Sequence, residues 1–192
     1  MTLEDHLTAF DACREARKWA RDYPTLRAAW DACERADWLL WYAAKRGTDR
    51  KLLVCAACAC ARTALPHVPS GENRPRRAIE LAARWANGDS AVTITELHAA
   101  YAAASAASAA SAASAADAAY AAFAAAYAAY TAYMASAANA AAYAAAYAAS
   151  AASAASAADA AFAAEAADAA RRRAHRTMCA IVRDLIPCPE EP

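Results

Sequence analysis

The sequence has very little glycine and few of the large aliphatic residues that fill most protein cores. Only 3 of the 192 residues are Gly, and Leu, Ile, Val and Phe together number 22. Sandwiches and barrels need β-branched strands, Rossmann-type folds need glycine-rich turns, and collagen needs glycine at every third position. These shortages exclude those architectures and predict an all-α chain.

The chain also lacks an excess of either charge. It has 20 basic and 20 acidic residues, and residues 98–170 contain no Lys or Arg at all. Proteins that bind nucleic-acid polymers usually present a strongly basic face, so we expect no such partner. The uncharged stretch consists mainly of Ala, Ser and Tyr, whereas membrane spans are rich in Leu, Ile, Phe and Val. We therefore expect no membrane partner either.

The spacing of the cysteines does not indicate a disulfide framework. There are 7 of them, an odd and scattered set, and no apolar leader follows the first residue. These features favour reduced thiols in a cytoplasm. Cys55 and Cys58 share a helix face, but Cys60 lies about 140° from Cys55, so no metal site is predicted. Without a nucleophile motif or a phosphate loop, we expect neither an enzyme nor a cofactor.

What the chain has in abundance is alanine, the strongest helix former. Of the 72 residues in 99–170, 48 are Ala, and Ser or Asp recurs at every third position for long runs. Side chains three residues apart do not stay on one face of a helix but wind around it. The spacing therefore indicates low-complexity expansion and not an amphipathic helix. We expect residues 1–97 to form an N-terminal helical region. Residues 98–192 should form a long Ala-rich hairpin and a C-terminal helix, packed with residues 1–97 as one domain of about six helices.

Large side chains in the Ala-rich part follow heptad spacing. One apolar seam joins Tyr120, Phe123, Tyr127, Tyr130 and Met134, and a second includes Tyr143 and Tyr147. A break between the two helices is predicted at 136–139, because Asn139 tolerates a left-handed conformation.

Helix signals are clearer in the N-terminal half. Capping boxes are predicted at Thr2 with Asp5 and at Thr93 with Glu96. The predicted helices run over residues 2–22, 24–47, 49–66 and 75–87, and each ends near a Pro or Gly signal.

The most informative segment is the second of these helices. On this continuous helix, Glu34 and Asp37 lie in one arc with Trp30, Trp38 and Trp41. Carboxylates among aromatic rings need partners. The chain offers basic partners in the next two helices, namely Arg62, Arg74, Arg76 and Arg77.

Two interpretations of this cluster stay open. It is either an ion-pair network that locks helices together or a polar, aromatic pocket or interface. Trp and Arg dominate interface hot spots, and Arg at a helix N-terminus suits an anion. With Asp31 added, the predicted binding surface comprises Asp31, Glu34, Asp37, Trp38, Trp41, Arg62, Arg74, Arg76 and Arg77.

Three segments are similar to a known family. Residues 29–47, 52–88 and 179–192, which include AWDACERADWLLWYAAKRG and CAIVRDLIPCPEEP, resemble immunity proteins of bacterial polymorphic toxin systems. The resemblance is to the all-α family called immunity protein five, in an Ala-rich form. It implies a helical fold that neutralises a toxin by binding and carries over no catalytic residue. Similar sequences also fit phage genomes, where such a protein would blunt a host defence.

The leading expectation is therefore a cytoplasmic, non-enzymatic protein that binds a protein toxin or effector. The first alternative is an anti-defence sponge that holds a phosphate-bearing, nucleotide-like molecule between Arg and aromatic side chains. A further alternative is a self-assembling structural protein, with a homodimer formed through the Ala-rich helices.

Overall fold

The described part of the chain is all-α. A computed structural model describes residues 2–111, 120, 124, 125, 127, 128, 130, 131, 138–158 and 163–189, and it contains no strand in these ranges. Within them, every helix is too short or too polar to cross a lipid bilayer. The predicted fold class, a helical bundle, is confirmed.

The first two predicted helices are each divided in two. The first comprises α1 (Leu3–Ala9) and α2 (Arg14–Ala20), and the second comprises α3 (Leu26–Ala32) and α4 (Ala36–Lys45). Asp11, with φ of 60°, takes the left-handed conformation that separates α1 from α2. Between α3 and α4 the backbone is extended at Cys33 and Arg35. These breaks turn one side of the molecule into a group of short helices.

The next three helices begin close to the positions that local sequence signals predict. Asp49 accepts hydrogen bonds at the start of α5 (Arg50–Arg62), and a short 3-10 turn, η1 (Leu65–His67), follows. α6 (Arg74–Ala86) has Pro75 in its first turn. The Thr93–Glu96 capping box opens α7 (Ile94–Ser111) through reciprocal hydrogen bonds. The Thr2–Asp5 box is likewise present at α1.

The Ala-rich segment is divided differently from a single hairpin. It supplies α7, α9 (Ala138–Ala158) and the first part of α10 (Ala163–Leu185). Asn139 lies inside α9, so the break predicted there is wrong at that residue, and positions 136 and 137 lie outside the described residues.

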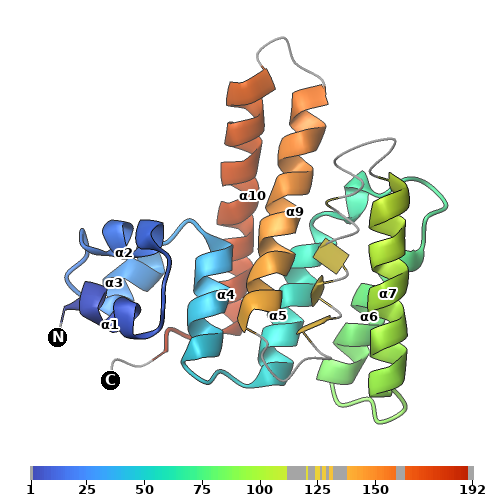
Figure 1. The fold of residues 1–192 in the computed structure, drawn as a ribbon, viewed down its shortest axis with the longest axis horizontal. Coiled ribbons are helices and arrows are strands. Elements are labelled where there is room, and N and C mark those ends of the chain that lie inside the picture. Colours follow the sequence, from blue (N-terminus) through green and yellow to red (C-terminus); the bar gives the residue numbers. More distant parts are fainter. Residues whose placement is uncertain are drawn as a thin grey trace.

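Figure 1 shows α9 and α10 side by side in the middle of the molecule. On one side lies α4, with α1–α3 beyond it; on the other side lie α5, α6 and α7. One core contains residues from both halves of the chain, such as Leu40, Val54 and Val182. Many of its members are alanines that are 0% exposed, including Ala57 and Ala144. Such small side chains bury little area but let helix backbones approach closely.

The two tyrosine seams meet at the edge of the core. The ring of Tyr127 lies 5.1 Å from that of Tyr143 and 5.4 Å from that of Tyr147. Tyr130 lies 5.0 Å from Tyr101 of α7. Burial raises the pKa of Tyr127, so its hydroxyl is uncharged at neutral pH. For the described members, the predicted seams form real contacts; Phe123 and Met134 lie outside the described residues.

Candidate functional site

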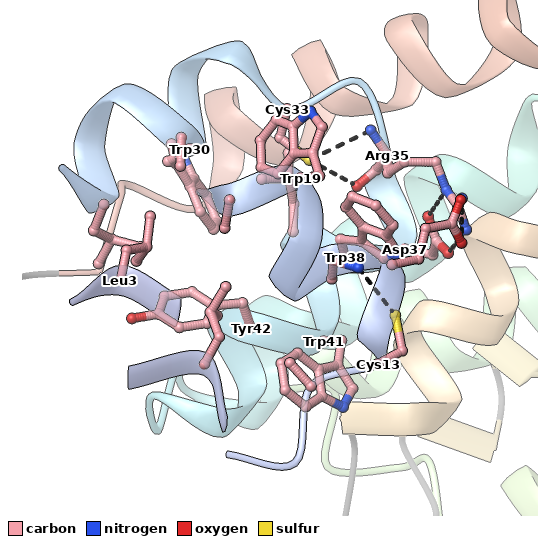
Figure 2. A pocket seen from close by; sticks show the side chains of 18 of the residues that line it. Leu3, Cys13, Trp19, Trp30, Cys33, Arg35, Asp37, Trp38, Trp41 and Tyr42 are labelled. Atoms are coloured by element: carbon pink, nitrogen blue, oxygen red, sulfur yellow. Dashed lines mark hydrogen bonds and ion pairs between the residues drawn. The ribbon is translucent and has the colours of Figure 1, made fainter. Parts of the chain in front are cut away.

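A cavity of about 370 Å³ lies between the three short N-terminal helices and α4. Figure 2 shows its aromatic walls, which come from Trp19 of α2, Trp30 of α3 and Trp38 and Trp41 of α4. Tyr143 of α9 completes the lining and is 49% exposed. The volume lies in the range of small-molecule and side-chain pockets. Four of the five tryptophans in the chain therefore surround one cavity.

The first wall, α1, is fixed to α4 by buried aromatic residues. His6 Nε2 and the hydroxyl of Tyr42 share a hydrogen bond of 2.8 Å. Phe10 meets both rings edge to face, with ring centroids 5.1 and 6.2 Å away. Burial lowers the pKa of His6, and nearby Arg46 lowers it further, so the imidazole is neutral at pH 7. An uncharged hydrogen bond inside an apolar contact thus holds α1 in place.

The third short helix, α3, is held in place by a residue of α10, the last helix in the sequence. Arg183 of α10 donates from Nε and Nη2 to the carbonyl oxygen of Trp30, at 3.1 and 2.7 Å. Its Nη2 also donates to the carbonyl oxygen of Cys33. The last carbonyls of a helix have no intrahelical partner, and a cation there is favourable. Arg183 therefore stabilises the break between α3 and α4 and sets the position of Trp30.

Arg35 and Asp37 form a bidentate ion pair at the wall of the cavity (Figure 2). Arg35 Nε lies 2.9 Å from Asp37 Oδ1, and Nη2 lies 2.7 Å from Oδ2. The guanidinium carbon lies 4.7 Å from the ring centre of Trp38, and Glu15 of α2 lies 3.9 Å from Nη1. The hydrogen bonds to Asp37 raise the pKa of Arg35 above its usual value. This guanidinium is therefore occupied by its own neighbours.

A buried histidine lies behind the pair. His175 of α10 is only 6% exposed, and its Nδ1 lies 3.9 Å from Asp37 Oδ1, beyond hydrogen-bond distance. Burial lowers the pKa of His175, although the charge of Asp37 acts in the opposite direction. The imidazole is therefore neutral at pH 7.

The predicted site residues of the second helix separate into two groups. Asp37, Trp38 and Trp41 line the cavity. Asp31 and Glu34 are exposed outside it. Asp31 pairs with Arg27 at 2.9 Å, and Glu34 Oε2 lies 3.6 Å from Arg176 of α10. The prediction that Glu34 lies in one arc with Asp37, Trp38 and Trp41 is wrong, because it assumed an unbroken helix.

The predicted basic partners lie elsewhere. Arg62, Arg74, Arg76 and Arg77 are exposed, none of them lines the cavity, and Arg74 pairs with Glu72. Asp37 is instead paired with Arg35, only two residues away. The physical reason is the break at 33–35, which places Arg35 beside Asp37 at the start of α4.

Sequence reasoning missed Trp19, Arg35 and His175. Trp19 was available as one of only 5 tryptophans, but the break between α1 and α2, which frames the cavity, carries no Gly or Pro. Arg35 and His175 lack a local motif. The break at 33–35 places Arg35 beside Asp37, and the packing of α10 against α4 brings His175 near this pair.

The cysteines are all free thiols. Burial raises the pKa of Cys33, which lines the cavity, to about 11, and that of Cys58 to about 12. Among the residues that the structure describes, no cluster of His, Cys, Asp and Glu has the arrangement of a metal site.

Comparison with known proteins does not add a family to this geometry. No protein-family model, no curated protein and no solved structure matches the chain. The functional argument therefore depends on the cavity itself.

Proposed function

We propose that this protein is a non-enzymatic binding protein that neutralises a protein toxin or effector, and that it does so by receiving a side chain of that partner in the tryptophan-lined cavity. The observation that carries the proposal is the gathering of Trp19, Trp30, Trp38 and Trp41 around one open space. Tryptophan in a desolvated pocket is typical of the few residues that supply most of the binding energy at a protein interface.

Charged groups around the cavity support the same proposal. Asp31 and Glu34 lie exposed next to the break that separates α3 from α4. Charges at the rim of an interface chiefly raise the association rate and fix the orientation of the partner. The tryptophans would then supply buried area, while the exposed charges of Asp31 and Glu34 supply steering.

A phosphate-bearing ligand receives less support at this cavity. Its one guanidinium, Arg35, is already in a bidentate pair with Asp37. The other arginines considered for phosphate binding are exposed on α5 and α6. Anion recognition needs donors that are not already satisfied by a carboxylate. Native mass spectrometry of the purified protein checks this point, because a retained small-molecule adduct would favour the sponge.

A matched pair of cavity variants tests the proposal. Ala16 lines the cavity at the third position of α2, and Ala28 occupies the third position of α3 without lining it. Both are half-buried, and both backbone amides donate to the capping side chain of their helix. Ala16→Leu should fill the space, whereas Ala28→Leu adds the same volume outside it.

The measurement is binding to the toxin or effector encoded beside the gene, together with protection of cells that express it. Wild type and Ala28→Leu should bind and protect alike, and Ala16→Leu should bind at least about tenfold more weakly, the equivalent of about 1.4 kcal/mol. Thermal melting confirms that both variants fold. Normal binding by a folded Ala16→Leu protein would exclude the cavity as the binding site.

A further inference from the structure

The charges that line the cavity are unequal. Three acidic residues line it, Asp11, Glu15 and Asp37, against one basic residue, Arg35. Arg35 lies between two of them, since it pairs with Asp37 and approaches Glu15 to 3.9 Å. The lining therefore keeps a negative excess after its own ion pair is formed, and Asp11 and Glu15 are exposed at the solvent side.

Aromatic faces attract cations, and the chain's own cations already show this here. Arg35 lies over Trp38 at 4.7 Å, and Lys45 Nζ lies 5.5 Å from the ring centre of Trp41. A ring attracts a cation within about 6 Å of its centre, and tryptophan does so most strongly. Tryptophan walls that share their lining with exposed acidic residues suit an aliphatic stem ending in a positive charge.

We infer that the side chain received by the cavity is basic, a lysine or arginine of the protein partner. Its methylene groups would pack on the tryptophan rings, and its charged end would face Asp11 and Glu15 at the rim. Long basic side chains bury their stems in this way while the charged end stays near water. This inference rests on the proposed function, because it specifies which side chain the same cavity takes.

The probe is a lysine side chain without the partner, supplied as Nα-acetyl-lysine N-methylamide. The matched neutral probe is Nα-acetyl-norleucine N-methylamide, whose aliphatic stem lacks the ammonium. Binding is followed by NMR through the indole N–H signals of Trp19, Trp38 and Trp41, which tolerates weak binding. We expect the lysine probe to bind about threefold or more tightly than the norleucine probe.

Two variants locate the charge preference. Asp11→Asn with Glu15→Gln removes both rim carboxylates, and Asn suits the left-handed backbone at position 11, where φ is 60°. The control is Glu80→Gln, the same change at an exposed residue of α6 that does not line the cavity. The double variant should lose the advantage of lysine over norleucine, and Glu80→Gln should keep it. Added salt should weaken lysine binding to wild type and leave norleucine binding unchanged.

The outcomes separate the inference from the proposed function. If norleucine binds as well as lysine or better, the cavity is an apolar pocket and the inference is wrong, while a side-chain pocket for a partner stands. If neither probe shifts any cavity indole signal, the inference fails and the cavity loses its proposed role too. An advantage of lysine that persists in the double variant or in high salt also overturns the inference.

Discussion

The guanidinium of Arg183 donates hydrogen bonds to the main-chain carbonyl of Trp30, although 153 residues separate them in the sequence. Through this contact, α10 stabilises the C-terminal end of α3 and holds one wall of the cavity in place. The position of Trp30 in the cavity wall therefore depends on Arg183.

Removing the guanidinium should therefore destabilise the protein. Arg183→Met keeps the aliphatic stem but leaves the carbonyls of Trp30 and Cys33 without this partner. We expect a loss of about 1.5–3 kcal/mol in the free energy of unfolding, the usual range for hydrogen bonds to a charged group. Urea unfolding measures it. Arg172→Met, an exposed change on the same helix, is the control, and equal midpoints for the two variants would contradict the prediction.

The alanine core should tolerate very little added volume. Ala144 of α9 is 0% exposed. Ala144→Leu should lower the free energy of unfolding by about 1–3 kcal/mol, because the neighbouring helices have no space for three more carbons. The same substitution at exposed Ala102 of α7 should change it by less than about 0.5 kcal/mol. Denaturant unfolding of both variants makes the comparison, and similar losses would mean that close helix packing is not the cause.

Stability should fall when the pH is lowered through the range in which histidine titrates. Burial holds the pKa of His175 below its ordinary value of 6.5, so the unfolded chain takes up a proton more readily than the folded chain. The free energy of unfolding is therefore fully retained above pH 6.5 and decreases as the pH falls through and below that value. His6 acts in the same direction.

His175→Phe isolates this contribution, because phenylalanine cannot take up the proton. Melting temperatures measured between pH 7 and pH 5 should fall less steeply for the variant than for wild type. His98→Phe, at an exposed position of α7, should keep the slope of wild type. An unchanged slope in His175→Phe would show that this imidazole does not titrate on unfolding.

Thiol reactivity should follow burial. The thiolate is the reactive form, and burial raises the pKa of Cys58 and Cys179 to about 12. Exposed Cys13 should react with iodoacetamide first, while Cys58 and Cys179 should react only after unfolding. Peptide mass spectrometry over a time course gives the order. Equal labelling rates at Cys13 and Cys58 would contradict the prediction that burial controls reactivity. Because Cys13 lines the cavity, a bound lysine probe should also slow the labelling of Cys13.

The sequence predicted the helices that carry conventional signals and missed the breaks that carry none. Asp49, Thr93 and Glu96 mark their helix starts by side-chain hydrogen bonds that depend on local spacing alone. The breaks near Asp11 and Cys33 contain neither Gly nor Pro. The second break is stabilised by Arg183, so its cause lies in tertiary packing that no local pattern reveals.

The same limit applies to the cavity. Trp38, Trp41 and Asp37 could be selected because they are large or charged residues close together on one short helix. Their relation to Arg35 depends on the break before α4, and their relation to Trp19 depends on how α2 packs against α4; the Trp19 and Trp38 rings lie 5.7 Å apart. Asp11 and Glu15 join the lining of the cavity for the same reason.

The contact between Arg183 and α3 also determines when the cavity can form during synthesis. A ribosome makes the carbonyl of Cys33 150 residues before the guanidinium that caps it. While the chain is growing, α1–α3 lack the anchor that positions Trp30. The cavity is therefore completed only after α10 has emerged from the ribosome.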